Sequence, residues 1–514
     1  MSTTHSSRCT SLAGRSMRLS CAAVLLWGSV PRSSAQTSTV PAEANVSSAQ
    51  MHQRLEKLSA DLITAQERLQ ESQRDIQRLQ DELSAILAQL PASARTAPVP
   101  SVASTPARSP EEIVERVDIL QAEVKQHEQT KVESVSKYPV RVSGLVLFNA
   151  FFNKGTVDNI DLPSISIPPT NYSSDMTTGA SLRQTILGVH ATGPHIFGAQ
   201  SFAEVNMDFY GGIPYSNYGT AAGIVRLRTG ALRLVWERDS FEAGLEGLLI
   251  SPLSPTSYAS VAEPLLAWAG NLWTWSPQLS YEHRFGSAST PHFALQAGLW
   301  DPPSAGYNLG ALYRAPSAGE RTGQPAYETR VSFAHDNTSA SMQFGLGGYY
   351  SRQSYPGRGG DSWAATADWR LPFGKVFELS GEAYRGRALG GLGGGVYKDV
   401  ITGVSPNTGL TSFRLLNASG GWAQAKFHLP GMLEANGVFG QDGGFASDFH
   451  SLVLPTTANN TMLRARNRMT TINLIFSPKT YLILSPEFRR ITTWPIYGAG
   501  VSANIFTMSF GLRF

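Results

Sequence analysis

Three arginines at two-residue intervals, Arg464, Arg466 and Arg468, form a group of side chains that could bind anions. Residues two apart in a β-strand point to the same side, so a strand here would place all three guanidinium groups on one face. A guanidinium keeps its charge and offers a fork of donors that matches carboxylate and phosphate oxygens. We therefore expect these arginines to concentrate small anions and to pass them between adjacent sites.

Other arginines repeat or extend this pattern. Arg226 and Arg228 have the same spacing, and Arg489 is a further candidate for the lining of a pore. The alternative is that nearby acids neutralise these cations and brace a wall, and five acids are suitable for this role: Glu204, Asp208, Glu237, Glu246 and Glu487. Since Glu487 precedes Arg489 by two residues, this pair is more typical of wall bracing than of selectivity.

The elements that must position these arginines are β-strands. From residue 138 to 514 the sequence alternates apolar and polar residues in short segments separated by Gly, Pro, Asn, Asp and Ser. This pattern predicts an all-β transmembrane antiparallel barrel of about sixteen strands. The last segment, 505–514, has large apolar residues at every even position and ends on Phe514, as expected of a strand with one face on lipid. A soluble β-sandwich is the alternative.

The barrel constrains where the arginines can lie. A charged group that faces lipid at mid-depth costs roughly 2–4 kcal/mol. Three of them on the lipid face would therefore be prohibitive within the membrane, and we expect the group at 464–468 to face the lumen or a loop above it. Tryptophans and tyrosines near strand ends favour interfacial girdles, while a lumenal path of aromatics for sugars is the alternative.

Composition excludes several other classes of protein. The chain has 514 residues, 16% charged and 10% aromatic, and its net charge of +3 is too small to suggest a nucleic-acid binder. No run of eighteen apolar residues follows residue 30, so a helical membrane protein is not expected. We find no catalytic motif and predict no enzyme activity, no cofactor and no metal. The glycine-rich segment 390–395 lacks the residues of a phosphate cradle and is expected to be a flexible loop.

The region before the barrel divides into four parts. Residues 1–35 resemble a secretory signal peptide, with basic residues before an apolar stretch and small residues at 33–35; a lipoprotein signal acylated on Cys21 is the alternative. Residues 45–90 predict a coiled coil, 91–110 a linker with five prolines, and 111–137 a short helical segment that would prolong the stalk.

The coiled coil is predicted from apolar residues at intervals of seven. One seam position is occupied by Leu55, Leu62, Leu69, Ile76, Leu83 and Leu90. The second seam position, three residues further on, is occupied by Leu58, Ala65, Ser72, Leu79 and Ile86. A single amphipathic helix packed on its own barrel is the alternative, but such a helix drifts away from a strict seven-residue repeat.

The mature chain resembles the DcaP-type trimeric outer-membrane porins and, more loosely, the phosphate-selective porins. The matching segments are 277–282, 297–302, 327–331, 471–478, 486–490 and the terminal strand. The resemblance implies a homotrimer with periplasmic helices at the inner mouth of the barrel. It also implies passage of small organic anions without energy coupling.

Two functions are consistent with these patterns. The first is an outer-membrane porin for passive diffusion of small hydrophilic solutes that favours small anions, dicarboxylates or phosphate, through an arginine-lined pore. The second is a structural envelope tether, in which the barrel anchors a periplasmic coiled coil that reaches peptidoglycan or an inner-membrane partner. Both place the barrel in the bacterial outer membrane, in contact with its lipid. A TonB-coupled receptor is disfavoured because the N-terminal region predicts a coiled coil instead of a globular plug.

Overall fold

The computed structural model describes residues 138–169, 171, 174–213, 223–286, 291–305, 314–337, 340–355, 358–454 and 464–514. The predicted signal peptide, coiled coil, proline-rich linker and short helical segment lie outside these residues, and their predictions stay untested. Within the described part of the chain, none of the helices has the length and apolar character needed to cross a membrane.

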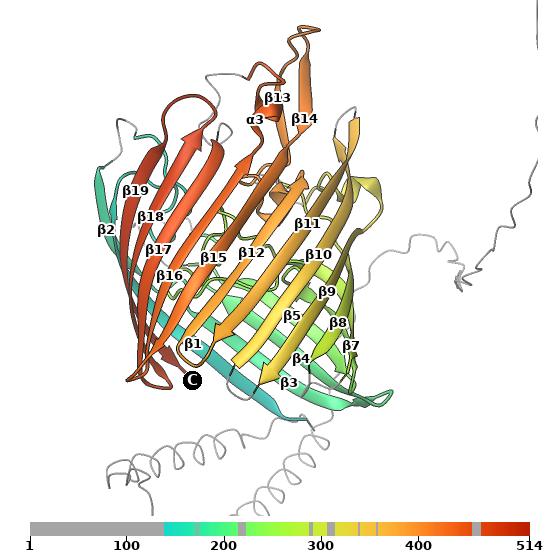
Figure 1. The fold of residues 1–514 in the computed structure, drawn as a ribbon, viewed down its shortest axis with the longest axis vertical. Coiled ribbons are helices and arrows are strands. Elements are labelled where there is room, and N and C mark those ends of the chain that lie inside the picture. Colours follow the sequence, from blue (N-terminus) through green and yellow to red (C-terminus); the bar gives the residue numbers. More distant parts are fainter. Residues whose placement is uncertain are drawn as a thin grey trace, which may run out of the picture. The chain divides into compact units, whose positions relative to one another are not determined.

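The described residues form one closed antiparallel β-barrel (Figure 1). Its strands are β1 (Val140–Lys154), β2 (Met176–Ser181), β3 (Ile186–Ile196), β4 (Ala199–Asp208), β5 (Arg226–Val235), β6 (Asp239–Glu246), β7 (Ser276–Phe285), β8 (His292–Trp300), β9 (Ala326–Asn337), β10 (Ala340–Tyr355), β11 (Arg358–Phe373), β12 (Phe377–Arg387), β15 (Asn417–Leu429), β16 (Leu433–Gly444), β17 (Arg464–Lys479), β18 (Leu482–Pro495) and β19 (Val501–Arg513).

The barrel closes because its first strand pairs with its last. Leu145 lies opposite Arg513, and the register continues to Lys154 opposite Asn504. On its other side, β1 pairs first with β3 and then with β2, which therefore act as two halves of one wall strand. The seventeen sheet strands of the described chain thus make a wall of sixteen, which confirms the fold class and strand number expected from the sequence.

The outer face of the wall carries the apolar residues that the alternating pattern predicts. Along β17, Ile472, Leu474 and Phe476 are exposed while the residues between them are buried. Phe488 on β18 and Phe506 on β19 lie on the same outer face. This contiguous band is what a barrel needs where it meets hydrocarbon.

The two ends of the barrel differ. At one end the strands are joined by short turns such as 197–198, 374–376 and 480–481, and the C-terminus lies at this turn end (Figure 1). At the opposite, loop end the connections include 155–175, 247–275 and 388–416. The last of these contains the 3₁₀ turn η3 (Gly390–Leu392) and the hairpin β13 (Val400–Val404) and β14 (Thr411–Leu415); helix α3 (Ala446–Phe449) follows β16.

Candidate pore constriction

A long segment lies inside the barrel. Residues 247–275, here called the lumenal loop, connect β6 to β7, yet their hydrogen-bond partners belong to strands around the whole inner wall. These partners include Glu328 on β9, Glu382 on β12, Gln424 on β15, Glu487 on β18 and Asn149 on β1. A segment that reaches all of these inward-facing residues must narrow the lumen.

Wall side chains hold the outgoing half of the lumenal loop, the part that follows β6, through hydrogen bonds to its backbone. The amide of Leu249 donates to Glu328 at 2.8 Å, and the amide of Leu253 donates to Glu382 at 2.7 Å. The backbone groups of the wall strands already pair with one another, so the buried amides of a loop inside the barrel need other acceptors. Carboxyl oxygens on the wall supply these acceptors, so the sequence of the wall fixes the course of the loop.

The middle of the lumenal loop is held by Gln184, which lies in the break between β2 and β3. Its side-chain oxygen accepts from the amides of Val261 and Ala262 at 2.7 and 3.1 Å. Its side-chain nitrogen donates to the carbonyl of Ala259 at 3.1 Å. One amide side chain therefore satisfies three backbone groups and fixes the tip of the loop.

The returning half of the lumenal loop, the part that leads into β7, packs closely on the wall at glycine positions. A Cβ atom at Gly440 on β16 would lie 2.4 Å from the carbonyl oxygen of Ala269. Gly270 has φ +109°, and a Cβ atom there would lie 2.3 Å from the carbonyl oxygen of Gly421. Asn467 on β17 donates to the carbonyl of Trp268 at 3.0 Å. This half of the loop therefore touches the wall with no room for a side chain between them.

The glycine-rich segment 390–395 is packed, which corrects the expectation of a flexible loop. The carbonyls of Gly391 and Leu392 accept hydrogen bonds from Thr274 and Trp273 of the lumenal loop at 2.9 and 3.2 Å. All six residues of the segment are buried. Side chains at Gly390 or Gly391 would collide with neighbouring backbone, so the glycines allow two loops to touch.

Arg226 and Arg228 on β5 share one carboxylate. Arg226 binds Asp208 with two contacts of 2.8 and 3.0 Å, and Arg228 lies 3.5 Å from the same group. Arg226 also donates to the carbonyl of Ala262 at 2.6 Å, so both strand and lumenal loop position it. Both guanidinium groups lie over the ring of Trp275, at 5.5 and 4.7 Å from its centroid.

Arg464 lies on the lumenal side, over the ring of Trp268 at 5.1 Å. Trp268 belongs to the returning half of the lumenal loop and stacks on Tyr397 at 4.5 Å. We call Arg226, Arg228 and Arg464, with the two indoles beneath them, the basic site. A cation–π contact orders an arginine side chain without neutralising its charge.

Two carboxyl groups of the loops lie close to the basic site. The pKa of Glu263 is raised to about 7, mainly by burial and also by the nearby Asp158, against the opposing charge of Arg226. Burial likewise raises the pKa of Asp158, against its hydrogen bonds from backbone amides and against the charge of Arg464. Because its pKa is near 7, Glu263 neutralises the neighbouring Arg226 incompletely at neutral pH.

Arg466 and Arg468 lie outside the lumen, and this placement corrects the expectation that the three arginines share one face. The pairing of β17 with β18 has an irregularity between Arg464 and Arg466, which moves Arg464 off the alternation. Beyond it, Asn467 and Met469 are buried on the inner face, while Arg466 and Arg468 share the outer face with the exposed Ile472.

Arg489 is part of the wall. Its guanidinium binds Glu487 at 2.7 Å and donates to the carbonyl of Pro163 at 3.0 Å, and its side chain is only 3% exposed. This geometry matches the wall-bracing alternative considered for the pair. A second braced group lies further toward the turn end, where Arg233 binds three glutamates. They are Glu204, Glu242 and Glu246.

The tryptophans divide between the two faces. Trp268, Trp273 and Trp275 lie in the lumenal loop, while Trp363 and Trp494 lie on the outer face of β11 and β18, where a girdle is expected. The sequence contained the signal for the outer group. The sequence has no periodic pattern that would place the loop tryptophans inside the barrel, because their position depends on wall residues far away in the chain.

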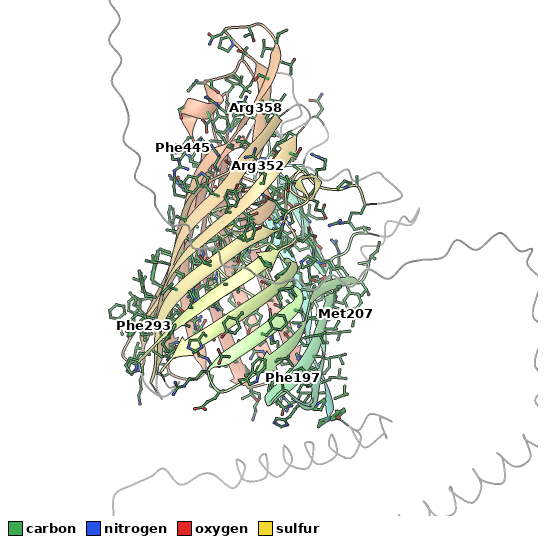
Figure 2. All side chains as sticks on the ribbon, turned by 90° about the vertical axis from the view of Figure 1, so that its right-hand side faces the viewer. Phe197, Met207, Phe293, Arg352, Arg358 and Phe445 are labelled. Atoms are coloured by element: carbon green, nitrogen blue, oxygen red, sulfur yellow. The ribbon has the colours of Figure 1, made fainter. Side chains whose placement is uncertain are left out.

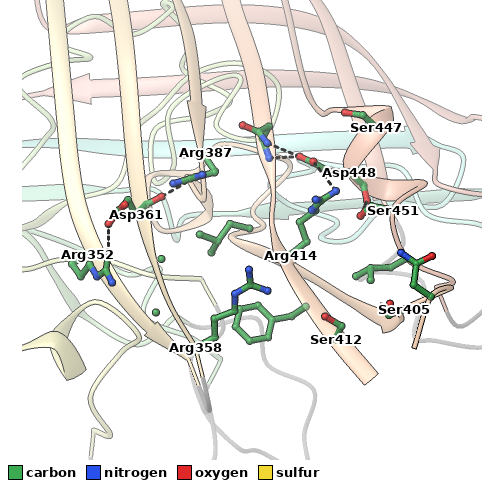
Figure 3. A pocket seen from close by; sticks show the side chains of 17 residues that line it. Arg352, Arg358, Asp361, Arg387, Ser405, Ser412, Arg414, Ser447, Asp448 and Ser451 are labelled. Atoms are coloured by element: carbon green, nitrogen blue, oxygen red, sulfur yellow. Dashed lines mark hydrogen bonds and ion pairs between the residues drawn. The ribbon is translucent and has the colours of Figure 1, made fainter. Parts of the chain in front are cut away.

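A pocket of about 710 Å³ opens at the loop end, among the ends of β10 to β12, the hairpin β13–β14 and helix α3 (Figure 3). Four arginines line it, Arg352, Arg358, Arg387 and Arg414, together with Asp361 and Asp448. Arg352 binds Asp361 at 2.6 Å and shares the outer face of β10 with the exposed Tyr350. The strand-borne part of this pocket therefore lies outside the lumen. Over the described ranges, we find no group of three or more His, Cys, Asp or Glu side chains suited to a metal ion.

Comparisons with known proteins agree with the geometry. No family model and no curated protein matches the sequence. The structure is similar to the outer-membrane channel DcaP of Acinetobacter baumannii, with 14% identity, 74% of this chain and 99% of that chain covered, and a TM-score of 0.54. An anion-selective porin from Comamonas acidovorans matches with 14% identity, 74% and 100% coverage, and a TM-score of 0.45. The expected resemblance to the DcaP-type channels is confirmed at the level of the fold.

Proposed function

We propose that this chain is a passive diffusion channel of the outer membrane for small hydrophilic solutes. We further propose that it favours small anions such as dicarboxylates or phosphate. The observation that carries the preference is the basic site, where Arg226 and Arg228 share the single carboxylate of Asp208 next to the lumenal loop. Two guanidinium groups that share one carboxylate leave an excess of positive charge at the narrowed part of the lumen.

The basic site would act by attracting an anion without holding it tightly. Arg226 and Arg228 already donate to loop carbonyls and to Asp208, so an anion would meet only their remaining donors. Conduction requires binding that is favourable enough to draw a solute in and weak enough to release it. Partial neutralisation by Asp208 supports such weak binding.

The charges nearer the turn end would promote release. Arg233 is outnumbered there by the three glutamates that bind it, so this part of the inner wall has a negative excess. After a solute anion passes the basic site from the loop end, these glutamates would repel it, and it would not meet a second anion-binding site. In a barrel with short periplasmic turns and longer external loops, this order of charges favours inward release.

Assembly and location belong to the same proposal. The exposed apolar band and the closed wall support insertion into an outer membrane, with the turn end toward the periplasm. A homotrimer, a cleaved signal peptide and a periplasmic coiled coil at 45–90 remain predictions. The same holds for the alternative of an envelope tether, because its predicted coiled coil lies outside the described residues.

The proposal is tested by the zero-current potential of the purified protein in a planar bilayer across a KCl gradient. An anion-selective potential supports both parts of the proposal. Conduction with cation selectivity would contradict the role of the basic site while leaving the channel intact. A barrel that stays closed in every preparation would contradict the channel itself and favour the tether.

A further inference from the structure

Three arginines lie together on the outer face of the barrel, near its loop end. They are Arg466 and Arg468 on β17 and Arg490 on β18, here called the outer arginine cluster. Thr470, the next outward residue after Arg468, pairs with Arg490, so the three side chains occupy adjacent outward positions. None of them contributes to the lumen, and the proposed channel does not use them.

Aromatic and amide groups order the cluster. Arg466 lies over the ring of Trp494 at 4.1 Å, and Arg468 lies over the same ring at 5.2 Å. Arg468 also donates to the side-chain oxygen of Gln441 at 3.0 and 2.8 Å. The guanidinium groups of Arg466 and Arg468 are thus held in place by neutral partners, which leave their charge uncompensated.

No carboxylate on the neighbouring strands compensates this charge in the described part of the wall. β17 and β19 contain no acidic residue. Asp442 on β16 and Glu487 on β18 are buried on the inner face, where Tyr384 and Arg489 bind them. The wall therefore lies between the cluster and the nearest acids of β16 and β18.

The height of the cluster along the barrel is informative. Toward the turn end, the outward residues that follow the pair Thr470 and Arg490 are Ile472 on β17 and Phe488 on β18, and both are exposed apolar side chains. An arginine facing lipid costs roughly 2–4 kcal/mol at the membrane midplane and about 0–1 near the interface. The apolar band below and the cations above together place the cluster at the level of the lipid headgroups.

We propose that the outer arginine cluster binds a phosphate group of a phosphorylated lipid in the external leaflet. A guanidinium fork matches two phosphate oxygens, and adjacent forks can hold one phosphate from two sides. Arg352 and Arg387 also face outward at the loop end, on β10 and β12, so positive charge recurs elsewhere on this rim. The proposal rests on the membrane location proposed above but does not depend on conduction.

The test uses the full chain in uncharged detergent, titrated with bis-phosphorylated lipid A and observed by native mass spectrometry. The double variant Arg466→Gln/Arg468→Gln removes two charges from the cluster. We expect its apparent lipid A affinity to be at least about tenfold weaker, because hydrogen bonds to charged groups are individually worth about that much. The matched control Arg238→Gln/Lys375→Gln removes two charges from the β5–β6 and β11–β12 turns and should bind like the unmodified protein.

Three results would overturn the proposal. Equal binding of lipid A from which the phosphates have been removed would show that acyl chains, not phosphate, are recognised. Competition by inorganic phosphate at the same concentration as lipid A would indicate a site for a free anion. If the double variant keeps its lipid affinity but changes its oligomeric state in the same spectra, the cluster contacts a second copy of this chain instead. Bilayer conductance of the double variant, which should be unchanged, separates failure here from failure of the channel proposal.

Discussion

Arg226 binds Asp208 through two hydrogen bonds, at 2.8 and 3.0 Å. Among the described residues, the buried carboxylate of Asp208 is the only acid at ion-pair distance from Arg226. Arg228 reaches the same carboxylate from 3.5 Å. This arrangement positions two cations over Trp275 while it neutralises about one of them. The charge excess of the basic site therefore depends on Asp208 as much as on the arginines.

Changing the ratio of cations to Asp208 should change ion selectivity in opposite directions. The double variant Arg226→Gln/Arg228→Gln removes two positive charges and should lower the anion preference or reverse it. Asp208→Asn removes the shared negative charge and should raise the anion preference. The measurement is the zero-current potential across a KCl gradient. A shift of both variants in the same direction would contradict the assignment.

Enlarging Gly440 should displace the lumenal loop. In Gly440→Ala the new Cβ atom would lie 2.4 Å from the carbonyl oxygen of Ala269, so the backbone must move. We expect the free energy of unfolding to fall by about 1–3 kcal/mol, a typical cost of overpacking. Single-channel conductance should rise as the loop leaves the wall. The control is Gly437→Ala on the same strand, where a Cβ atom meets nothing within 4 Å.

Removing the acceptor at Glu382 should loosen the outgoing half of the lumenal loop. Its carboxylate accepts from the amide of Leu253 and from the hydroxyl of Ser251. In Glu382→Ala the amide of Leu253 loses its partner, at about 1–3 kcal/mol for a group left buried and unsatisfied, while the hydroxyl of Ser251 still has the carbonyl of Leu272 as an acceptor. Limited proteolysis and the noise of the open-channel current should both increase. Glu378→Ala, at the turn end of the same strand, provides a control, and an equal effect there would argue against a specific anchor.

Glu263 should make selectivity depend on pH. Its pKa in the folded protein, about 7, lies above its ordinary value of 4.5, so the folded state favours the protonated form. The group therefore costs stability as pH rises from about 4.5 through 7, and the cost is absent below that window. Protonation also removes a negative charge beside Arg226, so anion preference should be stronger at pH 5 than at pH 8. Glu263→Gln should hold the pH 5 selectivity at both values; an unchanged pH response in this variant would contradict the role of Glu263.

The barrel could be predicted from the sequence because each strand carries its own signal. Alternation such as Ile472, Leu474 and Phe476 is local, and it determines which face meets lipid without knowledge of the partners. The pairing of Glu487 with Arg489 could be anticipated for the same reason, since residues two apart share a face. The break between β2 and β3 could not be anticipated. Gln184 lies in this break and binds the lumenal loop, whose position depends on residues distant in the sequence.

The arginines show where local reasoning fails. The alternation rule groups Arg464 with Arg466, and it is correct only for Arg466 and Arg468. A single irregularity in pairing at the start of β17 turns Arg464 inward, and its environment is completed by Trp268 of the lumenal loop. The expectation that arginines avoid the lipid face was sound for mid-depth, but it did not consider headgroup level, where a charge costs little.

The lumenal loop also constrains the order in which this chain can fold. The hydrogen bond from Ser257 to Glu487 joins residues 230 positions apart, and Leu253 and Glu382 are 129 apart. These acceptors come from strands made long after the loop itself, and contacts between distant residues form late because closing a long segment of chain is entropically costly. The wall must therefore assemble around a segment that is still undocked, and the lumen should pass through a wider stage before the loop reaches its anchors.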